Sequence, residues 1–325
     1  MDTAPKPLHA RPDHPHEART QHYLVTGGTG FIGTALCARL LADGQRVTVL
    51  SRQAQPSVAP GLTYVRSLNE LSPQTRFDVV VNLAGEPVVG PRWSAARRAV
   101  LHASRRDLTQ ALVRWLQNAQ DKPRLLISAS AIGYYGVQDE NDAAVLGEDA
   151  PPQPIFMSEL CQQWEQAAAA LADVPVAVMR LGVVLAHVTS GQGALPKMVA
   201  PLRLGLGGRL GSGRQIVSWV HLDDVLGAMD FVQSLPPAQA SGVFNLTAPQ
   251  PVSQAQFMDA ARACMRPAVC VPLAVPAWVL QLALGEQAGL LVQGQRVLPQ
   301  RLLQLGYTFR WPALDQALAA CLGPR

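Results

Sequence analysis

A glycine-rich run at residues 27–33, GGTGFIG, constrains this chain more than any other feature of its sequence. The run follows a short apolar stretch at 23–26 and precedes a second one that ends near residue 42, which together predict a buried strand, a tight turn and a helix. Such a turn lets the backbone approach a pyrophosphate at the start of the helix, where unpaired N–H groups and a partial positive charge favour anions. The residues predicted to contact a dinucleotide cofactor are Gly27, Gly28, Thr29, Gly30, Phe31, Ile32 and Gly33.

Further along the chain, strand-like apolar runs alternate with helical patterns. Strands are expected at 46–50, 78–83, 125–128 and 176–181, and two longer helices at 94–118 and 155–171. This alternation predicts an α/β fold, in which a doubly wound parallel sheet of the Rossmann type is covered by helices on both faces.

The 325 residues are expected to divide into three regions. Residues 1–21 are rich in proline, histidine and charge, which predicts a disordered tail. Residues 22–185 would form the Rossmann domain that binds the cofactor, and residues 186–325 a smaller α+β lobe for the substrate. Part of the chain near 215–250 is expected to return to the Rossmann domain.

Composition limits the classes of partner. Apolar residues make up 48% of the chain, which excludes a mostly disordered protein, and the net charge of +4 is too small to indicate a nucleic acid or a membrane surface as partner. The five cysteines form no CxxC pair, so no metal site is expected. The N-terminal region lacks the apolar stretch of a signal peptide, and the longest apolar run elsewhere is broken by prolines, so we expect a cytoplasmic protein.

The end of the second predicted strand indicates which dinucleotide binds. Sites for NAD usually place an acidic residue there, to accept a hydrogen bond from the ribose 2′-hydroxyl. This strand ends in Ser51 and Arg52, which suit the 2′-phosphate of NADP: Arg52 by its charge, Ser51 by a hydrogen bond. The sequence therefore favours NADP(H), the alternative being that Arg52 is only a solvated surface residue.

Four motifs resemble those of the extended short-chain dehydrogenase/reductase superfamily, the group of the NAD-dependent epimerases and dehydratases. They are TGGTGFIG at 26–33, NLAG at 82–85, SASAIGYYG at 128–136 and SWVHLDDV at 218–225. The chain is most similar to an atypical epimerase family with a C-terminal domain of unknown function, because it also carries LGLGGRLGSGRQIVSWVHLDDV at 204–225 and VLPQRLLQLGYTF at 297–309. The resemblance implies a Rossmann cofactor domain followed by a substrate lobe.

The resemblance also assigns places around the cofactor. Four residues would border its adenosine end, namely Asn82, Leu83, Ala84 and Gly85. Ser128 would lie beside the nicotinamide, and Ser130 matches the superfamily's serine that polarises the substrate oxygen.

One part of the superfamily's machinery is missing. Its catalytic pair is a tyrosine followed four residues later by a lysine, which lowers the pKa of the tyrosine. Lysine occurs here only at 6, 122 and 197, and none of these stands four residues after a tyrosine. The expected positions hold Phe156 and Leu160, so a proton must come from another group.

The candidates for that group are few. Tyr134 and Tyr135 follow Ser130 in the same loop, and either could reach the nicotinamide. The alternative is that one tyrosine packs and the other makes a structural hydrogen bond, and that Ser130 only caps a turn. Lys197 and His221 are further candidates, although a structural hydrogen bond is the more ordinary role for His221.

Two hypotheses about function follow. The first is an NADP(H)-dependent oxidoreductase or epimerase-like enzyme acting on a small polar carbonyl or hydroxyl compound. The second is a catalytically silent NADP(H)-binding protein that senses redox state or regulates a partner. The missing pair favours the second, whereas the intact cofactor turn and the polar loop with its serines and tyrosines favour the first. A nucleotide-sugar substrate is weakened because Val217 stands where the superfamily commonly has an arginine for the diphosphate, with Arg209 and Arg214 nearby as substitutes. The apolar stripes of the helices at 94–118 and 155–171 fit either packing on the sheet or a homodimer.

Overall fold

The computed structural model describes residues 20–52, 59–267, 271 and 274–323. The predicted tail at 1–21 lies outside these residues except for its last two. The strands are β1 (His22–Thr26), β2 (Arg46–Leu50), β3 (Leu62–Val65), β4 (Val79–Asn82), β5 (Leu125–Ala131), β6 (Val176–Leu181), β7 (Val183–Leu185), β8 (Arg209–Leu210), β9 (Ile216–Val217), β10 (Trp219–His221), β11 (Gly242–Leu246), β12 (Val252–Ser253) and β13 (Ala274–Val275). The helices are α1 (Phe31–Ala42), α2 (Ala95–His102), α3 (Leu108–Asn118), α4 (Phe156–Ala169), α5 (Leu195–Arg203), α6 (Leu222–Ser234), α7 (Pro237–Ala240), α8 (Gln254–Met265), α9 (Ala277–Leu284), α10 (Gly289–Val292), α11 (Gln300–Gln304) and α12 (Leu314–Leu322).

The centre of the molecule is a seven-stranded sheet in the order β11-β6-β5-β4-β1-β2-β3, and every neighbouring pair is parallel. The predicted doubly wound fold is confirmed. Its order reverses between β1 and β4, since the chain leaves β1 toward β2 on one side and later continues from β4 to β5 on the other. In open sheets of this kind ligands bind outside the carboxyl ends of the strands at such a switch point.

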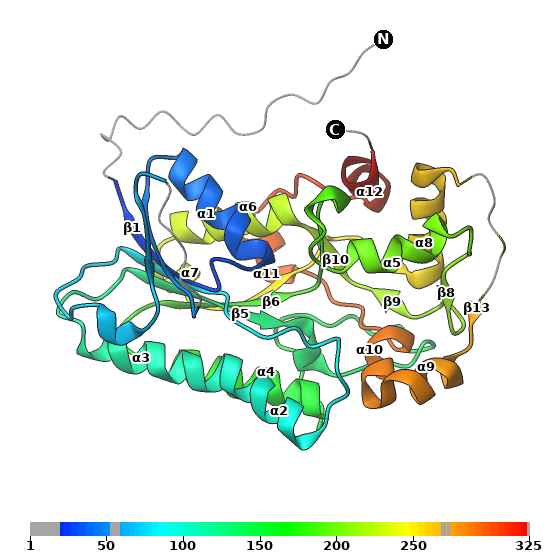
Figure 1. Cartoon of the computed structure of the whole chain (residues 1–325), viewed down its shortest axis with the longest axis horizontal. Coiled ribbons are helices and arrows are strands. Elements are labelled where there is room, and N and C mark those ends of the chain that lie inside the picture. Colours follow the sequence, from blue (N-terminus) through cyan, green and yellow to red (C-terminus); the bar gives the residue numbers. More distant parts are fainter. Residues whose placement is uncertain (1–19, 53–58, 268–270, 272–273, 324–325) are drawn as a thin grey trace, which may run out of the picture.

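Helices cover both faces of this sheet. Helices α1 and α6 lie on one face, and α2, α3 and α4 lie on the other (Figure 1). Alternate residues of β1 point to opposite faces, so Val25 packs in the core under α1 and α6 whereas Leu24 packs in the core under α3 and α4. Burial on both sides explains why these strands are almost wholly apolar.

A second core lies in the C-terminal half, where α5, α8 and α12 pack together. It includes Trp219 of β10, whose side chain is fully buried and whose Nε1–H donates to the carbonyl of Gln250 at 3.1 Å. The chain also returns to the central sheet, because β11 pairs with β6 from Gly242 to Leu246.

The helix predicted at 94–118 begins as expected, since the Ser94 hydroxyl accepts the N–H of Arg97 at 3.2 Å. It is not continuous, however. A π-helical turn at Ala103–Asp107 separates α2 from α3. Such turns are rare and frequently occur at functional sites. Strand β3, which extends the sheet beside β2, was not among the predicted strands.

Candidate functional site

A cleft of about 1440 Å³ opens at the carboxyl ends of β1, β2 and β4. Its walls come from the glycine turn after β1, the end of β2, the segment after β3, the loop after β4 and one side of α2 and α3. The predicted site residues that line it are Gly27, Thr29, Gly30, Ser51, Arg52, Leu83, Ala84 and Gly85. Residues distant in sequence thus meet where the doubly wound topology predicts a nucleotide.

The glycine turn fits closely against its surroundings. Gly27 has φ +69°, and a Cβ there would lie 2.7 Å from the carbonyl carbon and oxygen of Leu83. A Cβ on Gly33 would collide with the carbonyl oxygen of Gly27, so α1 can pack this closely against the turn only with glycine there. Helix α1 has Gly30 as its N-cap, without a side-chain cap and without an acid in its first turn. The N–H groups of that turn therefore remain suited to an anion.

Three of the predicted contact residues serve the packing of the turn. A Cβ on Gly28 would lie 2.8 Å from the Val49 side chain, so this glycine lets the turn sit on β2. Ile32 packs against the core under α1, and the ring of Phe31 lies under Gly193. None of these three is among the residues that line the cleft.

The end of β2 presents a charged pair. The Arg52 guanidinium donates to the Glu86 carboxylate at 2.7 Å, and the Arg52 side chain is 84% exposed. Both residues line the cleft, as does Arg66 from the segment after β3. Sequence reasoning missed Glu86 and Arg66, because they come to the same cleft as Arg52 only through the order of β3, β2, β1 and β4 in the sheet.

Asn82 and Ser128 lie behind the cleft wall and are fully buried. The Asn82 side chain accepts from the Thr26 hydroxyl at 2.7 Å and donates to the hydroxyls of Thr109 at 2.8 Å and Ser128 at 3.2 Å. This network ties β1, β4, β5 and α3 together. Both residues thus join neighbouring elements behind the cleft, and neither lines it.

Ser130 belongs to a buried polar cluster. Its hydroxyl donates to the Glu165 carboxylate of α4 at 2.6 Å, and the residue is 1% exposed. The same carboxylate receives Arg180 of β6 at 2.9 and 2.8 Å, which makes a bidentate ion pair. Since the proton of Ser130 is directed at Glu165, this geometry does not offer it to a substrate oxygen.

The two neighbouring tyrosines have different surroundings. Tyr135 is buried; its hydroxyl donates to Asn245 at 2.7 Å and accepts from Arg180 at 2.9 Å. Burial raises the pKa of Tyr135 to about 12. Tyr134 is only partly buried, and the Arg180 guanidinium lies 3.3 Å from the centre of its ring. Within the described residues its hydroxyl makes no hydrogen bond, so it is the one of the three predicted catalytic hydroxyls that is not already engaged.

The positions of the missing tyrosine–lysine pair are apolar in space as well as in sequence. Phe156 and Leu160 are buried on α4, beside Leu101 of α2. Cys161 follows them and is also buried, which raises the pKa of its thiol to about 12 and leaves it protonated and unreactive. His221 caps α6, since its Nδ1 accepts the N–H of Asp223 at 3.1 Å, and this is a structural contact.

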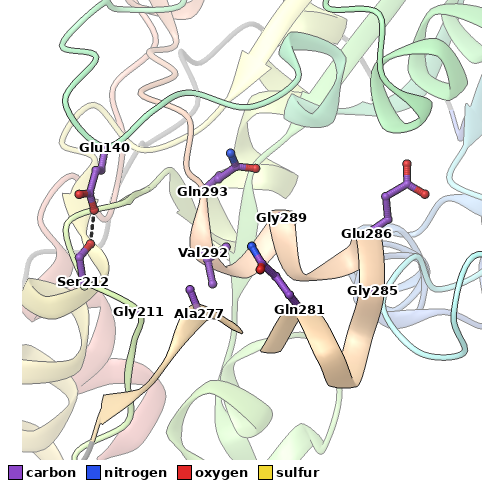
Figure 2. Close-up of a pocket in the computed structure, with 10 residues that line it drawn as sticks. All are labelled: Glu140, Gly211, Ser212, Ala277, Gln281, Gly285, Glu286, Gly289, Val292 and Gln293. Atoms are coloured by element: carbon purple, nitrogen blue, oxygen red, sulfur yellow. Dashed lines mark hydrogen bonds between the residues drawn. The ribbon is translucent and has the colours of Figure 1, made fainter. Parts of the chain in front are cut away.

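A second cavity, of about 640 Å³, lies in the C-terminal half (Figure 2). Glu140 and Ser212 form one side of it and Glu286 the other, while Gln281 and Gln293 project from the helical segment between them. None of the described residues that line it is basic. Its two glutamates are each paired with an arginine outside this lining, Glu140 with Arg214 and Glu286 with Arg98.

The arginines considered for a diphosphate have other surroundings. Arg214 pairs with the Glu140 carboxylate at the edge of this second cavity. Arg209 is exposed and does not line the cavity. Val217 pairs with Val252 in the short ladder between β9 and β12.

Comparison with known families accounts for most of the chain. The profile described as the NAD dependent epimerase/dehydratase family matches residues 23–247. The chain belongs to this family. A second profile, the domain of unknown function DUF1731, matches residues 275–321, which confirms the resemblance drawn from the motifs.

Several curated relatives match nearly end to end. The epimerase family protein YfhF of Bacillus subtilis is 35% identical over 312 residues, which cover 93% of this chain and 98% of YfhF. The human epimerase family protein SDR39U1 is 36% identical over 300 residues, covering 91% of this chain and 97% of the human protein. Both are described only as epimerase family proteins, so their names do not indicate a substrate.

Two solved structures are similar in fold and sequence. Human SDR39U1 (isoform 2), crystallised with NADPH, superimposes with a TM-score of 0.81 at 34% identity and covers 93% of this chain and 99% of that one. A nucleoside-diphosphate sugar epimerase from Corynebacterium glutamicum gives a TM-score of 0.71 at 28% identity, covering 94% of this chain and 58% of that one.

Two of the expectations concern metal ions and membranes. Within residues 20–52, 59–267, 271 and 274–323, no cluster of three or more histidine, cysteine, aspartate or glutamate side chains could hold a metal ion. The helices of the same part are too short or too polar to cross a membrane.

Proposed function

We propose that this protein binds NADP(H) in the cleft at the carboxyl ends of β1, β2 and β4. The observation that carries the proposal is the closely packed glycine turn at the uncapped start of α1, with Arg52 and Ser51 at the far end of the same cleft. The relative crystallised with NADPH supports it. The cofactor-binding unit would comprise residues 22–185 together with β11, and residues 186–325 would supply most of the substrate lobe.

The preference for the phosphorylated cofactor rests on charge. The end of β2 itself carries no acid, and Arg52 and Arg66 both line the cleft there; the neighbouring acid is Glu86 of the loop after β4, which pairs with Arg52. A 2′-phosphate carries about two negative charges near neutral pH, so a charge-assisted bond to Arg52 would favour NADPH over NADH.

Replacement of Arg52 by alanine is expected to weaken NADPH binding by about 10-fold, since hydrogen bonds to charged groups contribute about 1.5–3 kcal/mol. NADH binding should change by less than about twofold. Dissociation constants from the fluorescence of the bound nicotinamide measure both. Arg39→Ala is a matched control, because Arg39 lies on α1 and pairs with Asp230 away from the cleft. Equal weakening of both cofactors by Arg52→Ala would contradict the assignment.

We further propose an epimerase-like oxidoreductase acting on a small polar carbonyl or hydroxyl compound. A bound nicotinamide would supply or accept the hydride. Of the three predicted catalytic residues, Ser130 and Tyr135 use their hydroxyl hydrogens on Glu165 and Asn245. Tyr134 is therefore the better candidate to move the proton, and Ser130 and Tyr135 would hold the loop that presents it.

Tyr134→Phe is expected to reduce turnover at least about 100-fold, the usual contribution of a positioned general acid, while NADPH affinity stays unchanged. NADPH oxidation with a panel of small aldehydes and ketones provides the measurement. Tyr64→Phe is the matched control, because Tyr64 lies on β3 at the edge of the sheet, separated by β4, β1 and β2 from β5, which Tyr134 follows. Unchanged turnover in Tyr134→Phe would remove this residue from the mechanism.

A second function is favoured by a specific observation. The usual tyrosine–lysine pair is replaced by buried Phe156 and Leu160, and two of the three candidate hydroxyls are bound to protein groups. A catalytically silent NADP(H)-binding protein that senses redox state or regulates a partner fits these facts. Tight NADPH binding without turnover across the panel, together with a partner whose binding requires the cofactor, would support this function over the enzyme.

We assign the substrate to the second cavity, because all of its lining residues except Glu140 belong to the proposed substrate lobe. Because the described residues around it include two glutamates and two glutamines and no basic side chain, it suits an uncharged polar compound better than a nucleoside diphosphate. This agrees with Val217 standing where relatives of the superfamily commonly have an arginine. A homodimer through α2, α3 and α4 stays a prediction.

A further inference from the structure

The loop after β4 places an acidic residue beside the arginine that we assign to the 2′-phosphate. Glu86 lines the cleft, and its carboxylate accepts a hydrogen bond from the Arg52 guanidinium at 2.7 Å. The second carboxylate oxygen lies 3.9 Å from Arg97. One nitrogen of the Arg52 guanidinium is therefore already bonded to an anion.

The backbone of Glu86 is held from both sides. Its N–H donates to the Ser104 hydroxyl at 3.1 Å, and its carbonyl accepts from the Arg105 guanidinium at 2.8 Å. Both partners belong to the π-helical turn between α2 and α3. Ser104 is itself held, because its hydroxyl donates to the carbonyl of Leu101 at 3.0 Å.

The π-helical turn approaches the loop unusually closely. Arg105 is buried, and a Cβ on Gly85 would lie 3.1 Å from its guanidinium carbon. A Cβ at this position would require the guanidinium to shift by a few tenths of an ångström. The contacts between the π-helical turn and the loop thus hold the backbone of Glu86 in place, and from there its carboxylate reaches Arg52.

Arg52 is much less constrained than Glu86. Its side chain is 84% exposed, whereas that of Glu86 is 26% exposed. An exposed ion pair of this kind contributes little stability, so its effect on the fold is small. Its effect on the cofactor is larger, because a phosphate that approaches Arg52 must displace a neighbouring carboxylate and tolerate its negative charge.

We propose that Glu86 sets the cofactor preference of the cleft by competing with the 2′-phosphate for Arg52. When NADP(H) binds, Arg52 turns from Glu86 to the phosphate. When NAD(H) binds, the ion pair stays intact and Glu86 can accept a hydrogen bond from the ribose 2′-hydroxyl. In NAD sites an acid at the end of the second strand usually accepts this hydrogen bond. The inference rests on the proposed cofactor site. Glu86 thus limits how strongly the cleft prefers NADPH over NADH.

The test uses the full chain and measures binding alone. Glu86→Gln keeps the size of the side chain and its backbone contacts but removes the charge. We expect the ratio of the NADH to the NADPH dissociation constant to rise about three- to fivefold, mainly through tighter NADPH binding. Glu86→Asp, which keeps the charge, should leave the ratio within about twofold of the parent.

The control for general charge is Glu70→Gln. Glu70 lies in the segment after β3, accepts the N–H of Arg66 at 3.2 Å and does not line the cleft. Glu70→Gln removes the same charge from the same region, and the ratio of the NADH to the NADPH dissociation constant should not change. An equal rise in Glu70→Gln and Glu86→Gln would reduce the effect to long-range electrostatics and overturn the proposal.

A double-mutant cycle tests whether Glu86 acts through Arg52. In an Arg52→Ala background, Glu86→Gln should change the NADPH dissociation constant by less than half as much as in the parent, because no arginine remains to be released. The same change in both backgrounds, or no rise of the ratio in the single variant, would refute the competition. The proposed function fails separately, if the parent protein itself binds neither dinucleotide.

Discussion

Replacement of Glu165 by alanine is expected to lower the free energy of unfolding by about 3–5 kcal/mol, the usual cost of removing one member of a buried ion pair. The side chains of Arg180 and Glu165 are 3% and 11% exposed. Burial by itself would lower the pKa of Arg180, but hydrogen bonds and charge attraction from Glu165 raise it above its ordinary value. Without Glu165, the hydrogen-bond partners left to Arg180 among the residues that the structure describes would be the Tyr135 hydroxyl and the Glu148 carbonyl.

Urea denaturation followed by circular dichroism measures this loss. The control is Asp259→Ala, which removes an exposed carboxylate paired with Arg262 and should cost less than about 1 kcal/mol. Equal losses in the two variants would show that burial does not strengthen the pair.

A double replacement separates the pair from the space it fills. Glu165→Leu together with Arg180→Met removes both charges and keeps apolar volume, and such exchanges are often neutral or stabilising. We expect the double variant to recover at least half of the stability lost in Glu165→Ala. It should still lower turnover, because Arg180 stacks on Tyr134 and the Ser130 hydroxyl loses its acceptor.

The fold could be predicted from the sequence because its signals are local. The turn at 27–33 and the strands at 46–50 and 176–181 are encoded by residues adjacent in the chain, and the structure places them as expected. The break in the predicted helix at 94–118 carries no such signal. One π-helical turn at 103–107 changes neither the apolar pattern nor the helix propensity enough for the sequence to predict it.

The site was predictable only in part, for a related reason. Arg52 could be named because the end of a second strand is a fixed place in this fold. Glu86 could not be assigned as its partner, since the contact depends on the order of β2, β1 and β4 across the sheet. The engagement of Ser130 likewise depends on Glu165, which is 35 residues away on α4. The sequence shows which hydroxyl groups a loop contains, whereas tertiary packing determines which of them already donate a hydrogen bond to another protein group.

Replacement of Gly27 by alanine should have the largest effect on cofactor binding. The residue has φ +69°, and a Cβ would lie 2.7 Å from the carbonyl group of Leu83 and 2.8 Å from the N–H nitrogen of Ala84. These are backbone atoms at the end of β4 and cannot yield as a side chain would. The turn must therefore move away from the loop that forms the facing wall of the cleft, and a displacement of about 1 Å can cost about 100-fold in a positioned interaction.

Gly44 provides a matched control for this variant. It has nearly the same backbone angle, φ +72°, but nothing lies within 4 Å of the Cβ it would carry. Gly44→Ala should therefore show only the strain of a left-handed alanine, about 1 kcal/mol of unfolding free energy, with unchanged NADPH affinity. Gly27→Ala should lose about 2–4 kcal/mol, measured by urea denaturation, and about 100-fold in NADPH affinity, measured by fluorescence titration. If the two variants bound NADPH equally well, close contact between the turn and the loop after β4 would not be what forms the cofactor site.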